Sequence, residues 1–482
     1  MTVSSDARTP SAPVKSAALG AAAALLLNAC GAAPAELEES AAAEGPTPMD
    51  GAEAADSPPE DAAADDAPEQ EHDFPSTPAG ETAEYVLGVL NADEDSTSED
   101  WQDRLHEDFE AQVPAEELAE VVNSTVRPAR PWAVADHQDQ ELESVTRLES
   151  AAGELEMQIA LSEDQELIRT LFFGEPAEPV ETAESFEEIE ERLTELPGDI
   201  RALILQDGEP LLDLGSGEPA PLASAAKLYV LLAAVEAIEQ GETDWEEELE
   251  VTDELRSLPS GTLQDQEEGY QTSLFDVAHR MIEISDNTGT DMLIDHLGRD
   301  AVEEAAAEAN HHNPELLRPF LTTREMFQLR WGHPELGRGW AEADEQSRRD
   351  VLEELEDMPL EISSEDVGAE DVDFALDWHG TANDLAEVHR RLADHAQEHP
   401  ELVSILGRNP GLVTAAEDPW WQDIGFKGGS VPGVLTGSWH AVGQEGQDRT
   451  VVLLAQHADA AELAEESREL FALAQEALTV ED

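Results

Sequence analysis

An excess of acidic residues constrains this chain more than any other feature of its sequence. Asp and Glu number 111 against 25 Lys and Arg, a formal net charge of -86 at pH 7 over 482 residues. Such a chain repels itself in dilute buffer, whereas near 1 M salt the Debye length falls to ~3 Å and a densely carboxylated surface is tolerated. Because 40% of the residues are apolar and amphipathic periods are clear, we interpret the charge as salt adaptation of a folded protein. The alternatives are an acidic disordered chain and a mimic of nucleic acid.

Lysine is nearly absent, and two of the lysines stand in short motifs. Lysine occurs only at Lys15, Lys227 and Lys427. Lys227 closes a Ser-x-x-Lys tetrapeptide that begins at Ser224, and Lys427 opens a Lys-Gly-Gly tripeptide. A buried ammonium group shifts its pKa readily and can act as a base, which a guanidinium group cannot. We therefore predict that Lys227 transfers protons.

The N-terminus has the pattern of an export signal. Arg8 and Lys15 precede an apolar run over residues 17–27, which is too short for a stable membrane span. The run ends at Leu-Asn-Ala-Cys and resembles a bacterial lipoprotein signal, in which Cys30 would receive lipid. The alternative is an ordinary cleaved secretion signal, and both interpretations predict export. Cys30 is the only cysteine, which excludes intramolecular disulfides and cysteine-based zinc sites.

Composition divides the chain into a signal segment, a tether and two domains. After residues 1–30, residues 31–78 contain almost no large apolar side chain, which predicts a disordered acidic tether. We expect a first domain over residues 79–178 and a second over residues 181–482. The protein is expected on the extracellular face of the cell membrane, anchored through Cys30. No basic patch could neutralise phosphates, so nucleic acid is not an expected partner.

The first domain should contain helices followed by an antiparallel meander. Apolar periods predict helices over residues 81–90, 98–109 and 115–126, then strands over residues 132–136, 143–148, 154–160 and 167–173. This order favours an α+β cone in which a curved sheet wraps a helix. Asp103, His106 and His137 are the available polar residues, and surface polarity or a hydrogen-bonded histidine is the favoured interpretation of each.

The second domain should begin with a helix and a hairpin, continue with helices, and end with strands and a helix. We expect helices over residues 181–193, 224–240, 273–284, 288–297 and 460–478, and strands over residues 200–206, 211–214, 424–426, 434–442 and 450–456. Asp207-Gly208 predicts a hairpin turn between the first two strands. The helix over 224–240 is apolar on most faces and stops at Gly241, so it should be buried.

Two motifs in this domain bear on catalysis. Ser224 and Lys227 would lie one turn apart on a helix face, where a neutral amine can take the hydroxyl proton and the helix dipole favours negative charge. A Ser-x-x-Lys tetrapeptide recurs by chance in many chains, but its place at the start of a buried helix strengthens the catalytic interpretation. Ser285-Asp286-Asn287 lies between two helices, where the hydroxyl and the amide could shuttle a proton and hold a carbonyl. The alternative is a helix N-cap at Asp286 or Asn287.

Ser-x-x-Lys, Ser-Asp-Asn and a late Lys-Gly-Gly, in that order, resemble the serine β-lactamase and penicillin-binding protein superfamily over residues 181–480. The resemblance implies a β-lactamase/transpeptidase-like α+β fold, with an antiparallel sheet and a helical subdomain, and neither metal nor cofactor. It implies that Ser224 is the acylated nucleophile and Lys227 its base. Ser285 would transfer a proton, and Asn287 would position the substrate.

The resemblance also assigns the late motif. Lys427, Gly428 and Gly429 stand where the family has Lys-Thr-Gly, and Ser430 could supply the missing hydroxyl. The oxyanion would be held by the backbone amide of Ser224 and that of Ser430 or the next residue.

One departure concerns deacylation. Class A enzymes carry Glu-x-x-x-Asn after Ser-Asp-Asn, and this chain lacks that pair at its proper spacing over residues 313–326. Glu315 is the only nearby substitute for the glutamate. The other interpretation of Glu315 is a solvated loop carboxylate.

A second departure narrows the resemblance. A steroid-isomerase-like domain ahead of the hydrolase, with the stretches Arg318–Glu325 and Gly425–Ser430, resembles the β-lactamase-like proteins of clavulanic acid clusters and related actinobacterial lipoproteins. This implies a poor lactamase or an esterase. We therefore expect an exported serine hydrolase that forms an acyl-enzyme with a β-lactam or an ester. The alternatives are an enzyme that cleaves D-alanyl peptides and a penicillin-binding or sensing lipoprotein that does not turn over.

Overall fold

The structure is a computed structural model that describes most of residues 74–480. The residues left out within that range are 76, 107–108, 111–112, 140–141, 163–166, 175–181, 259, 357, 364–365, 369–371, 410, 412–420 and 445. The predicted signal segment, Cys30 and most of the predicted tether lie outside the described residues. The end of the predicted tether is wrong, because Phe74 packs against an apolar core and a helix begins at Pro78 with Thr77 as its N-cap. The chain divides into two compact units between Pro179 and Val180. None of the helices in the described ranges is long and apolar enough to cross a membrane.

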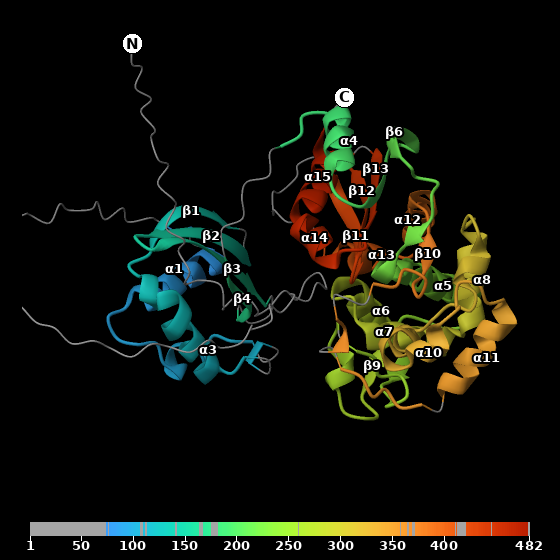
Figure 1. Ribbon diagram of the computed structural model, residues 1–482, viewed down its shortest axis with the longest axis horizontal. Coiled ribbons are helices and arrows are strands. Elements are labelled where there is room, and N and C mark those ends of the chain that lie inside the picture. Colours follow the sequence, from blue (N-terminus) through green and yellow to red (C-terminus); the bar gives the residue numbers. More distant parts are fainter. Residues whose placement is uncertain are drawn as a thin grey trace, which may run out of the picture. The chain divides into compact units, whose positions relative to one another are not determined.

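The first unit packs helices on a four-stranded antiparallel meander (Figure 1). Its elements are α1 (Pro78–Asn91), α3 (Ala115–Val121), β1 (Ala133–Asp139), β2 (Glu143–Ser150), β3 (Gly153–Leu161) and β4 (Ile168–Gly174). Helix α1 contacts β2 and β3, which buries Leu90 against Leu148 and Met157 in one apolar core. The predicted strands are confirmed, whereas the likeness to steroid isomerases stays a prediction.

The helix predicted over residues 98–109 is wrong. Among the described residues of this segment, a 3-10 turn forms over Ser98–Asp100, and α-helical backbone appears only at its end, at Phe109. Leu105 then bridges Ile168 of β4, and the N–H of His106 donates to Ile168 O at 2.9 Å. The apolar period reflects burial of Trp101 and Leu105 in the core, but the backbone uses its hydrogen bonds on the sheet edge, which overrides helix propensity.

The second unit is built around a five-stranded antiparallel sheet (Figure 1). In spatial order the strands are β11 (Trp421–Val431), β12 (Val434–Gly443), β13 (Asp448–Gln456), β5 (Asp199–Gln206) and β6 (Glu209–Leu214). One face packs against α4 (Phe186–Glu195), α14 (Ala460–Glu465) and α15 (Ser467–Thr479). The other face contacts α12 (Ala382–Ala396). The predicted antiparallel sheet and the hairpin turn at Asp207-Gly208 are confirmed.

A helical region surrounds the buried helix α5 (Lys227–Gln240), which ends at Gly241 with φ 74°. Its other helices and short strands are α6 (Leu274–Glu283), α7 (Asn287–Leu297), α8 (Arg299–Glu308), α9 (Thr323–Phe327), α10 (Pro334–Gly337), α11 (Glu345–Glu356), α13 (Glu401–Gly407), β7 (Ala220–Pro221), β8 (Glu248–Glu250), β9 (Gln271–Ser273) and β10 (His379–Gly380). The pairs β7–β10 and β8–β9 form two small ribbons.

Three helix boundaries differ from the predictions. Helix α4 begins at Phe186, because the Ser185 hydroxyl caps it by accepting from Glu188 N at 3.2 Å. The last helix is interrupted at Glu466 and forms α14 and α15. Residues Ala223–Ala226 form a 3-10 turn, so the α-helix that follows Ser224 begins at Lys227.

Candidate active site

Ser224 lies in the tight turn that connects β7 to α5. Ala223 has a left-handed backbone, with φ 46°. Ser224 is half-buried, and its hydroxyl makes no hydrogen bond to another residue in the described part of the chain. The hydroxyl is therefore available for reaction. Lys227 follows at the start of α5 and is 3% exposed.

Lys227 is held by three oxygen atoms from the loop between α6 and α7. Its Nζ lies within hydrogen-bonding distance of Ser285 O at 2.5 Å, Ser285 Oγ at 3.0 Å and Asn287 Oδ1 at 2.7 Å. The Asn287 amide group donates in turn to Leu258 O at 2.9 Å, which orients its oxygen toward the lysine. The structure thus brings Lys227, Ser285 and Asn287 together, as the motifs predict.

Asp286 performs the capping role that the sequence left open. Its carboxylate accepts from Gly289 N at 2.8 Å, and from Thr262 N and Leu263 N at 2.7 and 2.9 Å. Ser285 has φ 58°, so the backbone reverses there and both neighbours of Asp286 reach Lys227. Capping and the catalytic interpretation therefore coexist within one tripeptide.

Lys427 completes a cluster on the adjacent strand. It lies on β11, is 3% exposed, and its Nζ donates to Ser285 Oγ at 3.1 Å and to Gly428 O at 2.8 Å. The Ser285 hydroxyl therefore lies between two lysine amines. We call Ser224, Lys227, Ser285, Asn287 and Lys427 the lysine cluster.

Glycine allows β11 to approach the turn at Ser224. A Cβ atom on Gly429 would lie 2.6 Å from Ser224 N and 2.7 Å from Leu222 O, both backbone atoms. Any side chain there would push the strand away from Ser224. The next residue of β11 is Ser430, so the amide that the resemblance assigns to the oxyanion lies on a strand that touches the turn.

Burial and charge favour the neutral amine at Lys227. Desolvation lowers the pKa of Lys227 well below its usual value, and the charge of Lys427 lowers it further. Asp286 and Asp291 act in the opposite direction. A neutral amine beside the serine is the form that can accept a proton.

The sequence did not single out Asp291. Its carboxylate, 1% exposed on α7, accepts from Thr323 N at 2.7 Å and from Arg324 N at 2.9 Å. Burial raises its pKa to about 7, against these hydrogen bonds. Asp291 stands one helical turn after Asn287, and this i,i+4 spacing could have placed it beneath the lysine cluster.

Glu315 lies in an exposed turn. It is part of the 3-10 turn Pro314–Leu317, its side chain is 66% exposed, and it pairs with Arg318 at 3.2 Å. This environment favours the interpretation of Glu315 as a solvated loop carboxylate.

In the first unit, the surroundings of His137 and Asp103 test two of the polar residues that the sequence named. His137 on β1 shares a hydrogen bond of 2.8 Å with Thr146 and packs its ring edge-on against Phe74. Asp103 is exposed. These contacts favour the structural interpretation of both residues.

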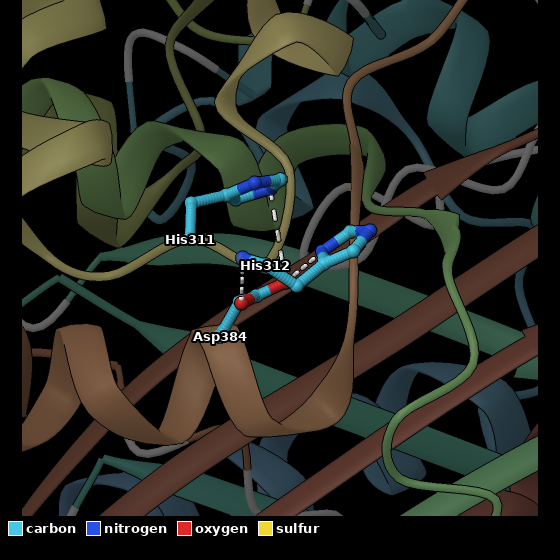
Figure 2. Close-up of side chains that lie close together, drawn as sticks. All are labelled: His311, His312 and Asp384. Atoms are coloured by element: carbon cyan, nitrogen blue, oxygen red, sulfur yellow. Dashed lines mark hydrogen bonds and ion pairs between the residues drawn. The ribbon is translucent and has the colours of Figure 1, made fainter.

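A second polar cluster lies at the start of α12, where Figure 2 shows two imidazoles facing one carboxylate. His312 Nδ1 lies 2.6 Å from Asp384 Oδ2, and His311 Nε2 lies 3.7 Å from the same oxygen. Two histidines and a carboxylate are a donor set that suits zinc. However, both ring nitrogens of His311 already have backbone partners, at 2.9 Å from His379 O and 3.1 Å from Asn313 N. The His311–His312–Asp384 cluster therefore serves as a structural hydrogen-bonded cluster at the start of α12.

Two family models match parts of this chain. Residues 184–410 match the family model described as the beta-lactamase enzyme family, and residues 74–167 match that of the ORF 12 gene product N-terminal region. The second unit therefore shows the sequence match and the β-lactamase/transpeptidase-like fold that its motifs predict for the serine β-lactamase and penicillin-binding protein superfamily. Lys427 lies beyond the matched range. No curated protein matches the chain.

Several solved structures resemble the second unit. PBP-A in an acyl-enzyme complex with penicillin G is 19% identical, with 61% of this chain and 95% of that chain covered and a TM-score of 0.42. A β-lactamase from Sphaerobacter thermophilus is 18% identical, with coverages of 61% and 95% and a TM-score of 0.44. A class A β-lactamase representative from Bacteroides cellulosilyticus is 17% identical, with coverages of 61% and 96% and a TM-score of 0.42. These likenesses concern the fold alone.

Proposed function

We propose that the second unit is a serine hydrolase that forms an acyl-enzyme at Ser224 with a β-lactam or an ester. The observation that carries this proposal is the position of Ser285 Oγ, 3.0 Å from Lys227 Nζ and 3.1 Å from Lys427 Nζ. A hydroxyl between two amines can pass a proton from one to the other side of a reaction centre.

The proposed acylation follows from these positions. The neutral amine of Lys227 takes the proton of Ser224, and Ser224 Oγ attacks the carbonyl carbon of the substrate. The negative charge on the carbonyl oxygen is held by the amides of Ser224 and Ser430. The carbon–nitrogen or carbon–oxygen bond then breaks, and the leaving atom receives the proton from Lys227 through Ser285 Oγ. Asn287 and Lys427 orient the substrate.

We further propose that β-lactam turnover is slow. Among the described residues, no carboxylate hydrogen-bonds to Lys227, and Glu315 is exposed. Water attack on the acyl-enzyme must then use Lys227 as the base. Small acyl groups leave more room for that water than an opened lactam does, so esters should turn over faster.

Burst kinetics test this function. The full chain is mixed with chromogenic β-lactams and with p-nitrophenyl acetate, and product is followed from the first milliseconds. We expect one product per active site from the lactam and then a slow steady rate. A steady lactam rate of roughly 10 per second or more would contradict slow turnover. If Glu315→Gln abolished such a rate but left acylation intact, Glu315 would be the deacylation base.

Adding D-alanyl-D-alanine peptides to this assay separates the two alternative functions. Release of D-alanine from D-alanyl-D-alanine peptides, faster than ester or lactam hydrolysis, would favour the peptidase. Acylation with no detectable turnover of any substrate would favour a penicillin-binding or sensing protein.

We also propose that the protein is exported, lipidated at Cys30 and adapted to high salt. The support is the lipoprotein-like signal and the net charge of -86. Loss of membrane association in Cys30→Ala tests the anchor. A melting temperature that rises from dilute to molar KCl tests salt adaptation, and a flat or falling one would contradict it.

A further inference from the structure

The backbone just before Ser224 is held in a conformation that an alanine rarely adopts. Ala223 has φ 46°, in the left-handed region that favours glycine. A non-glycine residue keeps such a conformation only where its surroundings enforce it. The contacts around Ala223 should therefore explain how the turn is maintained.

One side-chain contact acts on the Ala223 backbone directly. The N–H of Ala223 donates to Asp377 Oδ1 at 2.8 Å, and Asp377 is 4% exposed. The residue before Ala223 is tied to the same segment, because Leu222 N donates to Trp378 O at 2.7 Å. The segment continues into β10, which pairs with β7. The chain is thus fixed on the N-terminal side of Ser224 by residues 377–380.

Asp377 is an expensive residue to bury for fold stability alone. Its second oxygen, Oδ2, is buried and has no hydrogen-bond partner among the described residues. Burial raises the pKa of this carboxyl, although His379, the Ala223 N–H and Arg330 act against that rise. Apart from a contribution of the adjacent Trp378 N–H to its pKa, the hydrogen bond of this side chain in the described residues goes to the backbone that leads into Ser224.

We propose that Asp377 is a positioning residue for acylation: by accepting the Ala223 N–H it fixes the turn that aims the Ser224 hydroxyl and amide at the substrate carbonyl. This inference rests on the proposed role of Ser224. A rotation at Ala223 would move the Ser224 N–H, which the mechanism uses to hold the oxyanion. It would also move the hydroxyl relative to Lys227.

The variants Asp377→Ala and Asp377→Asn test the proposal in the full chain. The acylation rate at saturating fluorescent penicillin should fall about 100-fold in Asp377→Ala, since a misplacement near 1 Å costs that much. The apparent dissociation constant of the penicillin should change little. Asp377→Asn keeps an oxygen that accepts the N–H, so its rate should stay within about 3-fold of the wild type. A wild-type rate in Asp377→Ala, or equal losses in the two variants, would overturn the proposal.

Two further measurements separate positioning from general damage. Glu303→Ala is the matched control, because Glu303 is buried on α8 and accepts the backbone N–H of Phe320 at 3.0 Å; it should lower the melting temperature without slowing acylation. Adding Ala223→Gly to Asp377→Ala removes the strain that Asp377 counteracts, so part of the rate should return. No recovery would contradict action through the Ala223 backbone. If the wild type itself fails to label at Ser224, the proposed function fails instead.

Discussion

Two polar clusters of the second unit both bring reactive residue types together, but they differ in which of their atoms lack a partner. In the lysine cluster, Ser285 Oγ is shared by two amines, and the Ser224 hydroxyl has no described hydrogen-bond partner. In the His311–His312–Asp384 cluster (Figure 2), both ring nitrogens of His311 have backbone partners, and His312 Nδ1 is paired with the Asp384 carboxylate. The comparison shows that a group of reactive residue types can act as a reaction centre only where some donor or acceptor atoms are not already engaged in structural hydrogen bonds.

The largest effect is expected at Lys227. In Lys227→Arg the acylation rate should fall roughly a thousand-fold, because a guanidinium group cannot accept the proton of Ser224. Stopped-flow labelling with fluorescent penicillin measures this rate. Lys427→Arg is the matched control, since it keeps a positive charge on β11, and it should lose far less. Equal losses in the two variants would break the distinction between base and substrate-binding lysine.

A smaller effect is expected from the charge of Lys427. Desolvation and Lys427 both lower the pKa of Lys227, so Lys427→Gln should raise that pKa. Because the neutral amine is the active base, acylation rises with pH through this pKa. The acid limb of the rate profile should therefore move up by about one unit in Lys427→Gln. An unmoved or downward-shifted limb would contradict the coupling of the two lysines.

The other cluster should affect stability rather than rate. Asp384→Ala removes acceptors of the N–H groups of His312 and Thr381, at 2.7 Å each, and should cost about 2–4 kcal/mol of unfolding free energy. Burial opposes ionisation, but His311, His312 and these hydrogen bonds lower the pKa of Asp384 overall.

The sign of the pH dependence follows from that lowered pKa. The stabilisation by Asp384 is present above the carboxyl pKa of the unfolded chain and is lost as the pH falls through the folded value. Denaturant melts from neutral pH into acid should show wild type and Asp384→Ala converging. An acylation rate more than about 3-fold below wild type in Asp384→Ala would contradict the assignment of Asp384 to stability and not to catalysis.

The smallest effect is expected from metal. Both ring nitrogens of His311 have backbone partners, so zinc should shift the melting temperature by less than about 1 °C at concentrations near 0.1 mM. Differential scanning calorimetry with and without a chelator measures it. A rise of several degrees that disappears in His312→Ala would show that the His311–His312–Asp384 cluster binds metal.

Local chemistry along the sequence predicted much of the lysine cluster. Ser224, Lys227, Ser285, Asn287 and Lys427 lie in short motifs whose residue types specify their roles. Asp377 carries no such signal, because it meets Ala223 only through long-range folding of β10 beside β7. The helix prediction over residues 98–109 failed for a related reason. The apolar period of this segment reflects burial of its side chains, whereas its backbone conformation is set by pairing with the edge of the sheet.

The most direct test of the central claim is the site of covalent modification. The full chain is incubated with a fluorescent penicillin, digested and mapped by mass spectrometry. The account predicts one label per chain on Ser224, formed as the β-lactam ring opens, and no label in Ser224→Ala. A label on Ser285 or Ser430, or labelling that survives Ser224→Ala, would contradict it.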